Sequence, residues 1–335
     1  MSNRILKIEK LGFQWKTESP YLAVMHHVDT YPAGNEEMGP AVSLEGRDIG
    51  QDFSWKDGFS MYHGETVPGF PAHPHRGFET VTIMKDGFVD HFDSMGAFGR
   101  YGNGDVQWLT TGKGVQHAEM FPLLNMDSGN RGELFQIWLN LEAKNKMVEP
   151  EYKMLWSEDI PIIENKGNYT VRLINGSFNN IKGLEPTVAS WAKDEKHNMR
   201  ILDIILEPNG SIDLPKGTDT TNRNIYFYEG EGSIIIDDKE IPSGSRVKLK
   251  GSEVVTINNA SKESKILLLE GEPINEPVAI YGPFVMNTKE EIIETAREYR
   301  ETEFGGWPWT IYDPVNPREM GRFASYANGK VDKKY

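Results

Sequence analysis

The sequence contains no cysteine, no long apolar run and no cluster of positive charge. Without cysteine the chain has no disulfides, no thiolate nucleophile and no sulfur ligands, so any metal must be bound through nitrogen and oxygen. The longest apolar runs, such as 234–236 and 266–269, are far too short to span a bilayer, and the first ten residues lack the apolar stretch of a signal peptide. We therefore expect a soluble, cytoplasmic protein that does not contact membranes.

Acidic residues outnumber basic ones, because 50 Asp and Glu against 36 Lys and Arg leave a formal net charge of -14. A negative field of this size repels a phosphate backbone, so we expect no direct binding to nucleic acid. The 335 residues, 38% of them hydrophobic, suffice for two domains with ordinary cores. We expect the chain to be monomeric.

Short runs rich in Val, Ile, Tyr, Phe and Thr, separated by Gly, Asn, Asp and Pro, dominate the chain. This pattern is typical of antiparallel sandwiches and barrels. Asp86-Gly87 separates the runs 80–84 and 88–92 and predicts a tight hairpin, because glycine adopts positive φ without steric cost. A second set of runs begins near Tyr169 and shows the same alternation of short apolar runs and turn residues. The sequence thus predicts an all-β fold with two tandem barrels of jelly-roll type.

We interpret residues 149–167, which contain Pro150, Pro161 and a Lys166-Gly167 turn, as a linker between the two barrels. The first domain is expected at residues 1–160, including an N-terminal extension, and the second at 168–280. Residues 281–335 are expected to form a C-terminal helix and a tail.

A capping box predicts the helix, because Thr288 is followed three residues later by Glu291. The helix should cover about 289–300 and bury an apolar stripe formed by Ile292, Ile293, Ala296 and Tyr299. The aromatic segment 304–309 should then pack on a barrel, while the charged end at 331–335 frays.

Two short patterns carry the chemistry: His73-Pro74-His75 and His117-Ala118-Glu119. Residues two apart in a strand point to the same face, so each pattern presents two ligand atoms side by side. Two such strands facing each other would hold a metal ion with three imidazoles and one carboxylate. Pro74 cannot donate to a sheet ladder, which places the first pair at a strand start or an edge. The second half contains a single histidine, His197, so the chemistry belongs to the first barrel.

The residues around these patterns strongly resemble the pirin family of the cupin superfamily, over about residues 55–305. The resemblance implies two cupin barrels, of which the first binds one metal ion, usually iron, and the second binds none. Carried over residue by residue, the implied metal ligands are His73, His75, His117 and Glu119. The stretches that carry the resemblance are 69–82, 91–96, 104–108, 112–120, 136–141, 146–152 and 282–288.

Glu79 is a competing carboxylate. Cupins in general use a glutamate four residues after the second histidine, and in an unbroken strand Glu79 would share the face of His73 and His75. Pirins use the later glutamate, so we hypothesise that Glu119 is the ligand and that Glu79 orients an imidazole or has a structural role.

The resemblance leaves two function classes open. In one, Fe(II) binds a flavonol or similar small aromatic substrate together with dioxygen, as in quercetin 2,3-dioxygenase, and Glu119 acts as the catalytic group that helps to deprotonate the substrate. Mn, Ni, Cu and Zn are alternative metals. In the other, the protein is a non-enzymatic regulator whose metal alters a surface that a partner protein reads. We favour the enzyme.

The remaining histidines have weaker assignments. We expect His91 to be a hydrogen-bonded strand histidine, and His63 to lie either near the pocket mouth or in a surface loop. His26, His27 and His197 are interpreted as structural. The first 50 or so residues and the tail after Gly305 depart from the pirin pattern, and either could cover the pocket mouth.

Overall fold

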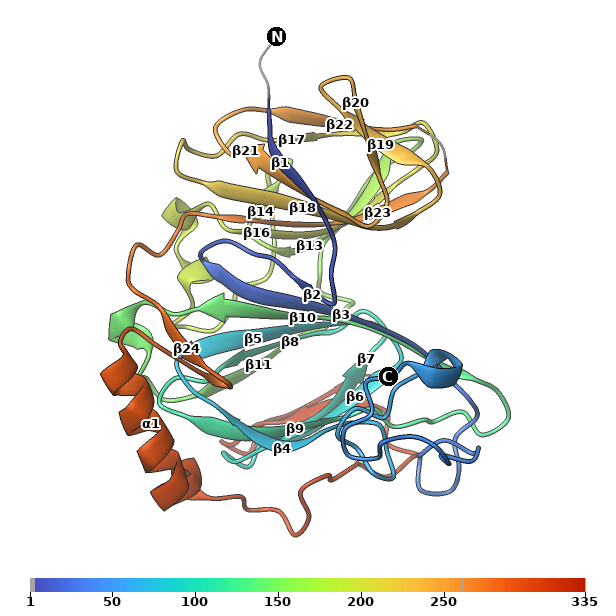
Figure 1. Ribbon diagram of the computed structural model, residues 1–335, viewed down its shortest axis with the longest axis vertical. Coiled ribbons are helices and arrows are strands. Elements are labelled where there is room, and N and C mark those ends of the chain that lie inside the picture. The colour runs from blue at the N-terminus through green and yellow to red at the C-terminus, as the bar shows by residue number, and fades with distance from the viewer. Residues whose placement is uncertain (1–3, 261, 335) are drawn as a thin grey trace. The chain divides into compact units, whose positions relative to one another are not determined.

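The computed structural model describes residues 4–260 and 262–334. Antiparallel strands dominate it, and the described residues contain one α-helix, α1 (Lys289–Thr302) (Figure 1). Contacts between residues divide the chain into two units. Unit 1 comprises Met1–Met25, Trp138–Asn140 and Glu158–Asn275, and unit 2 comprises His26–Ile137, Leu141–Ser157 and Glu276–Tyr335.

Unit 2 contains two sheets. One has the strand order β27-β26-β7-β6-β9-β4, and the other has the order β11-β8-β5-β10-β3, with the short strand β2 (Gln14–Trp15) continuing it beyond the unit. Buried side chains from both sheets, among them Met84, Leu109, Val115 and Tyr152, pack into one core and close a barrel. The strands of the first sheet are β4 (Gly69–His75), β6 (Phe88–Asp93), β7 (Phe98–Gly102), β9 (Val115–Met120), β26 (Arg322–Ser325) and β27 (Val331–Lys334). Those of the second are β3 (Tyr21–Tyr31), β5 (Phe78–Asp86), β8 (Val106–Thr110), β10 (Asn130–Asn140) and β11 (Glu151–Leu155).

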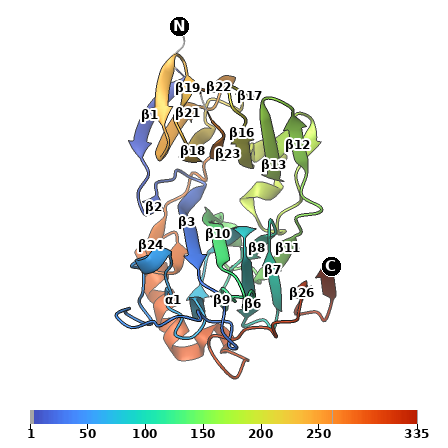
Figure 2. The same cartoon turned by 90° about the vertical axis from the view of Figure 1, so that its right-hand side faces the viewer.

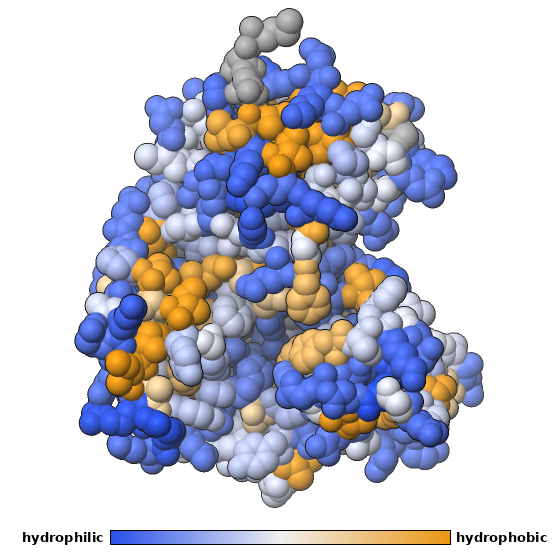
Figure 3. Space-filling model, in the orientation of Figure 1, coloured by the Kyte–Doolittle hydropathy of each residue, from blue (hydrophilic) through white to orange (hydrophobic). Residues whose placement is uncertain are grey.

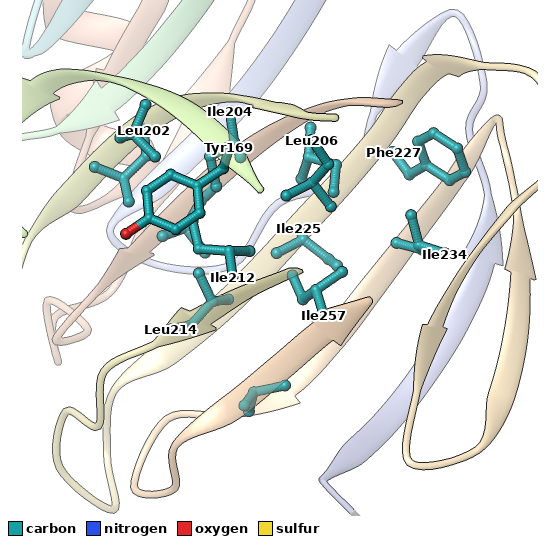
Figure 4. Close-up of a cluster of buried hydrophobic side chains, with 14 of the residues drawn as sticks. Tyr169, Leu202, Ile204, Leu206, Ile212, Leu214, Ile225, Phe227, Ile234 and Ile257 are labelled. Carbon is teal, nitrogen blue, oxygen red and sulfur yellow. The ribbon is translucent and has the colours of Figure 1, made fainter. Parts of the chain in front are cut away.

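Unit 1 contains the second barrel, whose interior is filled with aliphatic and aromatic side chains such as Leu202, Ile225 and Phe227 (Figure 4). Its larger sheet has the order β1-β21-β18-β23-β16-β13-β12, and its smaller sheet has the order β17-β22-β19-β20. The larger sheet contains β1 (Ile5–Lys10), β12 (Ile162–Asn165), β13 (Tyr169–Asn175), β16 (Arg200–Leu206), β18 (Asn222–Gly230), β21 (Ser245–Lys250) and β23 (Ser264–Gly271). The smaller sheet contains β17 (Ser211–Leu214), β19 (Ser233–Ile236), β20 (Lys239–Pro242) and β22 (Val255–Asn259), and β14 (Ser177–Phe178) pairs separately with β15 (Ile181–Lys182). The predicted all-β fold with two barrels and a C-terminal helix is confirmed.

The first strand of the chain belongs to the second barrel. β1 pairs with β21, with Ile8 opposite Val247. The two units are therefore each built from separate segments of the sequence. The domain boundaries expected from the sequence assign one continuous segment to each domain, and they stay a prediction.

One local prediction is wrong. The runs around Asp86-Gly87 do not form a hairpin, because β5 pairs with β8 while β6 pairs with β7 and β9 of the other sheet. Gly87, at φ +84°, instead lets the chain cross from one sheet to the other. The expected linker 149–167 contains two strands, since β11 pairs with β8 and β12 pairs with β13, and its role as a linker stays a prediction.

The C-terminal segment agrees with the sequence in part. Thr288 and Glu291 form both halves of the capping box at the start of α1. Ile292 packs with the hairpin strand β25 (Phe284–Met286), which pairs with β24 (Ala279–Tyr281). Ile293, however, is 69% exposed and is not part of the buried stripe. Figure 3 shows apolar surface on the side of the molecule where Figure 1 draws α1 and β24.

The tail packs on unit 2 as predicted, because the Trp309 indole donates to the Asp93 carbonyl oxygen over 2.8 Å. Its charged end does not fray. Residues Val331–Lys334 form β27, which pairs with β26, and β26 in turn pairs with β7 (Figure 2).

Candidate metal centre

Neighbouring strands of one sheet bring the three histidines together. β4 pairs with β9 so that His73 lies opposite His117, and His75 lies opposite Val115. The ring of His117 lies 4.5 Å from that of His73 and 4.9 Å from that of His75, measured between centroids. One nitrogen from each ring lies within 4.8 Å of the other two. The two strands that carry the histidines are thus hydrogen-bonded neighbours in one sheet, and they do not face each other in the way that the sequence predicts.

The edge position of β4 explains how Pro74 is accommodated. β4 is the last strand of its sheet, so Pro74 has a neighbouring strand on one side only, and the histidine pair lies at the end of the strand. On the open side, the amide of Ala72 donates to the carbonyl oxygen of Tyr312 in the C-terminal tail over 2.7 Å. The tail therefore covers the strand edge that carries His73.

Burial keeps the three imidazoles neutral near pH 7. It lowers the pKa of His73 to about 4, and it holds the pKa values of His75 and His117 well below the usual value for histidine. The Nδ1 of His73 lies 2.8 Å from the carbonyl oxygen of Pro71, so this nitrogen carries the proton and Nε2 keeps its lone pair. The cluster therefore presents imidazole lone pairs, which are the form of histidine that binds metals.

His117 shows most directly that the cluster fits a metal ion. Both of its ring nitrogens are buried, and neither has a hydrogen-bond partner among the described residues. A buried polar atom without a partner costs on the order of 1–3 kcal/mol, so such atoms are rare unless they serve a ligand. A divalent cation between the three rings would bind the unprotonated one of these two nitrogens.

Glu119 adjoins the cluster without belonging to the group of three. Its Oε2 lies 3.7 Å from Nε2 of His117, which is too long for a hydrogen bond. Gln136 Nε2 donates to the same oxygen over 2.7 Å, and Thr82 Oγ1 donates to Oε1 over 3.3 Å. Burial raises the pKa of Glu119 above its ordinary value. Two hydrogen bonds therefore fix the orientation of the Glu119 carboxylate beside the histidine cluster, and its raised pKa makes it a stronger base than an exposed glutamate.

Glu79 lies in the other sheet. The chain turns at Arg76-Gly77, where Gly77 has φ +83°, and β5 then starts with a new strand phase. On β5, Thr82 faces the barrel interior and reaches Glu119, so Glu79, three residues earlier, points to the opposite face of the strand. Its Oε1 accepts from Thr110 Oγ1 over 2.7 Å. The unbroken strand that would put Glu79 beside His75 does not exist, and an orienting role for Glu79 stays a prediction.

The other histidines near the centre have distinct partners. His91 is buried in β6, its Nε2 lies 3.1 Å from Asp93 Oδ2, and its ring stacks on Tyr152. His63 Nδ1 lies 2.9 Å from the Gly50 carbonyl oxygen, and its ring contacts Phe70 edge-on.

Gln136 has no role predicted from the sequence, although it lies in a stretch that carries the pirin resemblance. His27, interpreted from the sequence as structural, is hydrogen-bonded to Tyr62, which in turn donates to Asp29. The signal was the alternation of His27, Asp29 and Tyr31 on one face of a strand.

Comparison with known proteins decides the family. The family model described as Pirin matches residues 36–139, and the model described as Pirin C-terminal cupin domain matches residues 201–305. Human Pirin is 38% identical over 253 residues, which cover 74% of this chain and 81% of the human protein. This chain belongs to the pirin family. A pirin-like protein of Solanum lycopersicum is also 38% identical, over 234 residues that cover 69% of this chain and 75% of the tomato protein.

A solved structure supports the same assignment for the pirin fold. The quercetin 2,3-dioxygenase from Acinetobacter baumannii superposes with a TM-score of 0.71 at 26% sequence identity, and the match covers 90% of this chain and 98% of that protein. The two barrels of this pirin are accordingly cupin domains. None of the helices in the described part of the chain has the length and apolar character needed to cross a bilayer.

Proposed function

We propose that this pirin is a metal-dependent dioxygenase of quercetin 2,3-dioxygenase type, with Fe(II) bound by His73, His75, His117 and Glu119. The observation that carries the proposal is the buried group of three neutral imidazoles, in which His117 has no other hydrogen-bond partner among the described residues. The similarity to a protein named quercetin 2,3-dioxygenase supports a flavonol or a related small aromatic as substrate.

The donor set suits the metal. Three imidazoles and a carboxylate are typical ligands of divalent first-row metals, so Fe(II) competes with Mn, Ni, Cu and Zn for the same site. When bound, the metal supplies an electrophilic centre with open positions for substrate and dioxygen.

Glu119 is the residue proposed to receive the substrate proton. Its raised pKa makes the carboxylate a stronger base than an exposed glutamate, and the two donors Gln136 and Thr82 hold it in one orientation. A hydroxyl placed next to Glu119 would transfer its proton to a carboxylate oxygen as the substrate becomes an anion.

Aromatic side chains shield the centre from water. The ring of Phe70 lies 6.3 Å from that of His73 and stacks on Tyr62 at 5.1 Å. Such walls keep the local dielectric low, which strengthens the interaction between the site and a charged substrate.

Metal analysis of the purified protein tests the site. We expect about one metal ion per chain in the wild type and in His197→Gln, which changes a histidine of the other barrel. His117→Ala should lose most of the metal, and Glu119→Gln should lose more than Glu79→Gln. Full metal content in His117→Ala would overturn the site, and metal loss confined to Glu79→Gln would reverse the assignment of the carboxylate.

Activity is tested by loading the protein with Fe(II) without oxygen and then adding quercetin and oxygen. The proposal predicts a spectral change on mixing and consumption of both reactants, and neither should occur with His117→Ala. A metal-loaded protein that binds and converts no flavonol would exclude this reaction for that substrate and favour the regulatory role.

A further inference from the structure

Unit 2 contains a cavity of about 330 Å³ to which no role has yet been assigned. Apolar side chains form most of its wall, among them Met84, Phe121 and Leu134. His27 and Asp29 of β3 also line it, and Arg131 lies at its border. A space of this size accommodates a small aromatic molecule.

Two residues that line the cavity, Leu134 and Phe121, lie close along the chain to Glu119 and to its partner Gln136. On β10, Leu134 lies two residues before Gln136, and Gln136 is hydrogen-bonded to Glu119. Phe121 lies two residues after Glu119, just beyond the end of β9. Side chains two apart on a strand share a face and are separated by roughly 7 Å. Leu134, Phe121 and Met84 belong to one hydrophobic cluster of the barrel interior. The cavity wall therefore contains residues that lie two positions along the chain from Glu119 and from Gln136, its hydrogen-bond partner.

A chain of three hydrogen-bonded polar groups ends at this cavity. The Tyr62 hydroxyl donates to Asp29 Oδ2 over 2.7 Å, and His27 Nδ1 lies 2.9 Å from the same hydroxyl oxygen. The backbone amide of Ser60 donates to the other oxygen of Asp29 over 2.9 Å. The Tyr62 ring meets His27 edge-on at 4.9 Å and stacks on Phe70, so the three groups are held in place.

The hydrogen bonds set the tautomer of His27. The Tyr62 hydroxyl uses its single hydrogen to donate a hydrogen bond to the Asp29 carboxylate. Its oxygen therefore accepts a hydrogen bond from Nδ1–H of His27, and Nε2 of His27 retains a lone pair. Burial lowers the pKa of His27 to about 4, so the ring is neutral near pH 7. Among the described residues, Nδ1 is the one nitrogen of His27 that has a hydrogen-bond partner. His27 thus contributes one acceptor of fixed orientation to the polar part of the cavity wall.

This arrangement selects the chemistry of the ligand. A largely apolar wall with acceptors from His27 and from the Asp and Asn side chains around it suits an aromatic ring that carries a hydroxyl donor. A ligand carboxylate would meet the lone pair of Nε2 and the nearby charge of Asp29, and Arg131 offers little compensation because it already pairs with Asp86 and Glu133.

We propose that this cavity binds the ring of a hydroxylated aromatic substrate that lies farthest from the histidine cluster, and that His27 Nε2 accepts a hydrogen bond from a hydroxyl of this ring. Tyr62 and Asp29 are positioning residues that hold the imidazole in the accepting tautomer. The inference deepens the proposed function and rests on it for the identity of the substrate class.

Equilibrium binding of two flavonols tests the inference. Galangin is quercetin without the two hydroxyls of the B ring, so the ratio of the two dissociation constants isolates those hydroxyls. Titrations of the metal-loaded protein without oxygen should show quercetin binding about 5- to 10-fold more tightly, as expected for one buried hydrogen bond. His27→Phe should bring the ratio to about one while galangin affinity stays within about twofold of wild type.

The matched control is His26→Phe. His26 is the neighbouring histidine on β3, faces the other side of the strand and contacts Glu133, so the ratio should stay at the wild-type value in this variant. If His27→Phe does not fold, Tyr62→Phe keeps the ring stack and removes only the hydroxyl. In Tyr62→Phe the ratio should fall, and ¹⁵N spectra should show that the proton on His27 is no longer confined to Nδ1.

Equal affinities in the wild type, or an unchanged ratio in both His27→Phe and Tyr62→Phe, would overturn the inference. These outcomes are distinct from failure of the proposed function. A His27-dependent ratio without oxygen consumption would refute the dioxygenase and keep the binding site. Dioxygenase activity together with a ratio of dissociation constants that is unchanged in the His27 variant would support the dioxygenase and refute the binding site.

Discussion

Gln136 donates its amide to the Oε2 atom of Glu119, the same oxygen that lies nearest to His117. The amide therefore holds the carboxylate at the side of the histidine cluster. Groups that orient a metal ligand in this way typically contribute 10- to 100-fold to metal affinity.

Gln136→Leu should weaken Fe(II) or Ni(II) binding by about 10- to 100-fold, measured by competition with a chelator. Gln107→Leu is the control, because the Gln107 amide is fully buried and has no hydrogen-bond partner among the described residues. Equal affinities in the two variants would show that the Gln136 amide does not serve the metal site.

Asp29 predicts a specific dependence of stability on pH. Burial raises its pKa from 3.8 to about 6, against the opposing hydrogen bonds from Tyr62 and Ser60. A carboxyl whose folded pKa is raised contributes stability that is present below pH 3.8 and is lost as the pH rises through 6. The neighbouring Asp52 has a pKa lowered to about 2 and stays ionised throughout this range.

Asp29→Asn removes this contribution. Relative to the variant, the wild type should lose up to about 3 kcal/mol of unfolding free energy between pH 4 and pH 7. Urea denaturation of both proteins at several pH values measures the difference. Parallel curves for the two proteins would mean that Asp29 titrates near its ordinary pKa in the folded state.

Arg100 fastens the C-terminal tail to the barrel. Its buried guanidinium makes two hydrogen bonds of 2.7 Å to Asp90 and also donates to the carbonyl oxygens of Asn316 and Met320. Arg100→Met would leave the buried Asp90 charge without its cationic partner, so we expect a loss of about 3–5 kcal/mol in denaturation experiments.

Proteolysis should also cut the segment 306–321 faster in Arg100→Met. The control Arg297→Met breaks a surface pair with Glu294 in which both side chains are 59% exposed, and it should cost less than about 1 kcal/mol. A tail that resists proteolysis equally well in both variants would contradict the fastening role of Arg100.

Gly77 is required at the turn after His75. Its φ is +83°, and an added Cβ would collide with the carbonyl oxygen of Val285. Gly77→Ala should therefore lower the unfolding free energy by at least about 2 kcal/mol and reduce the metal content. Gly96→Ala has a similar φ of +87° with no atom near the new Cβ, so it should show only the conformational cost of about 1 kcal/mol and keep its metal.

Much of the metal centre was predictable from the sequence, because its residues form two short patterns. His73 and His75 share a face, as do His117 and Glu119, through the two-residue repeat of a strand alone. The capping box of α1 was predictable for the same reason, since Thr288 and Glu291 interact within one helical turn. The confirmed all-β class followed from the alternation of apolar and turn residues.

Pairings between distant segments were not predictable. Asp86-Gly87 has the local signature of a hairpin, yet the chain crosses between sheets there, because the hydrogen bonds of β5 and β6 are completed by strands that come later in the chain. The apolar Ile293 lies at helical spacing but faces away from the hairpin that covers Ile292.

The sequence by itself determined which side chains share a strand face and therefore which residues could act together as ligands. The tertiary structure alone decided that β4 and β9 are neighbours, that Glu79 lies in the opposite sheet, and that His27, Asp29 and Tyr62 meet beside a cavity. The physical reason is that side-chain direction along a strand is a local property. The partner of each strand is instead set by long-range hydrogen bonding and packing, which no short pattern encodes.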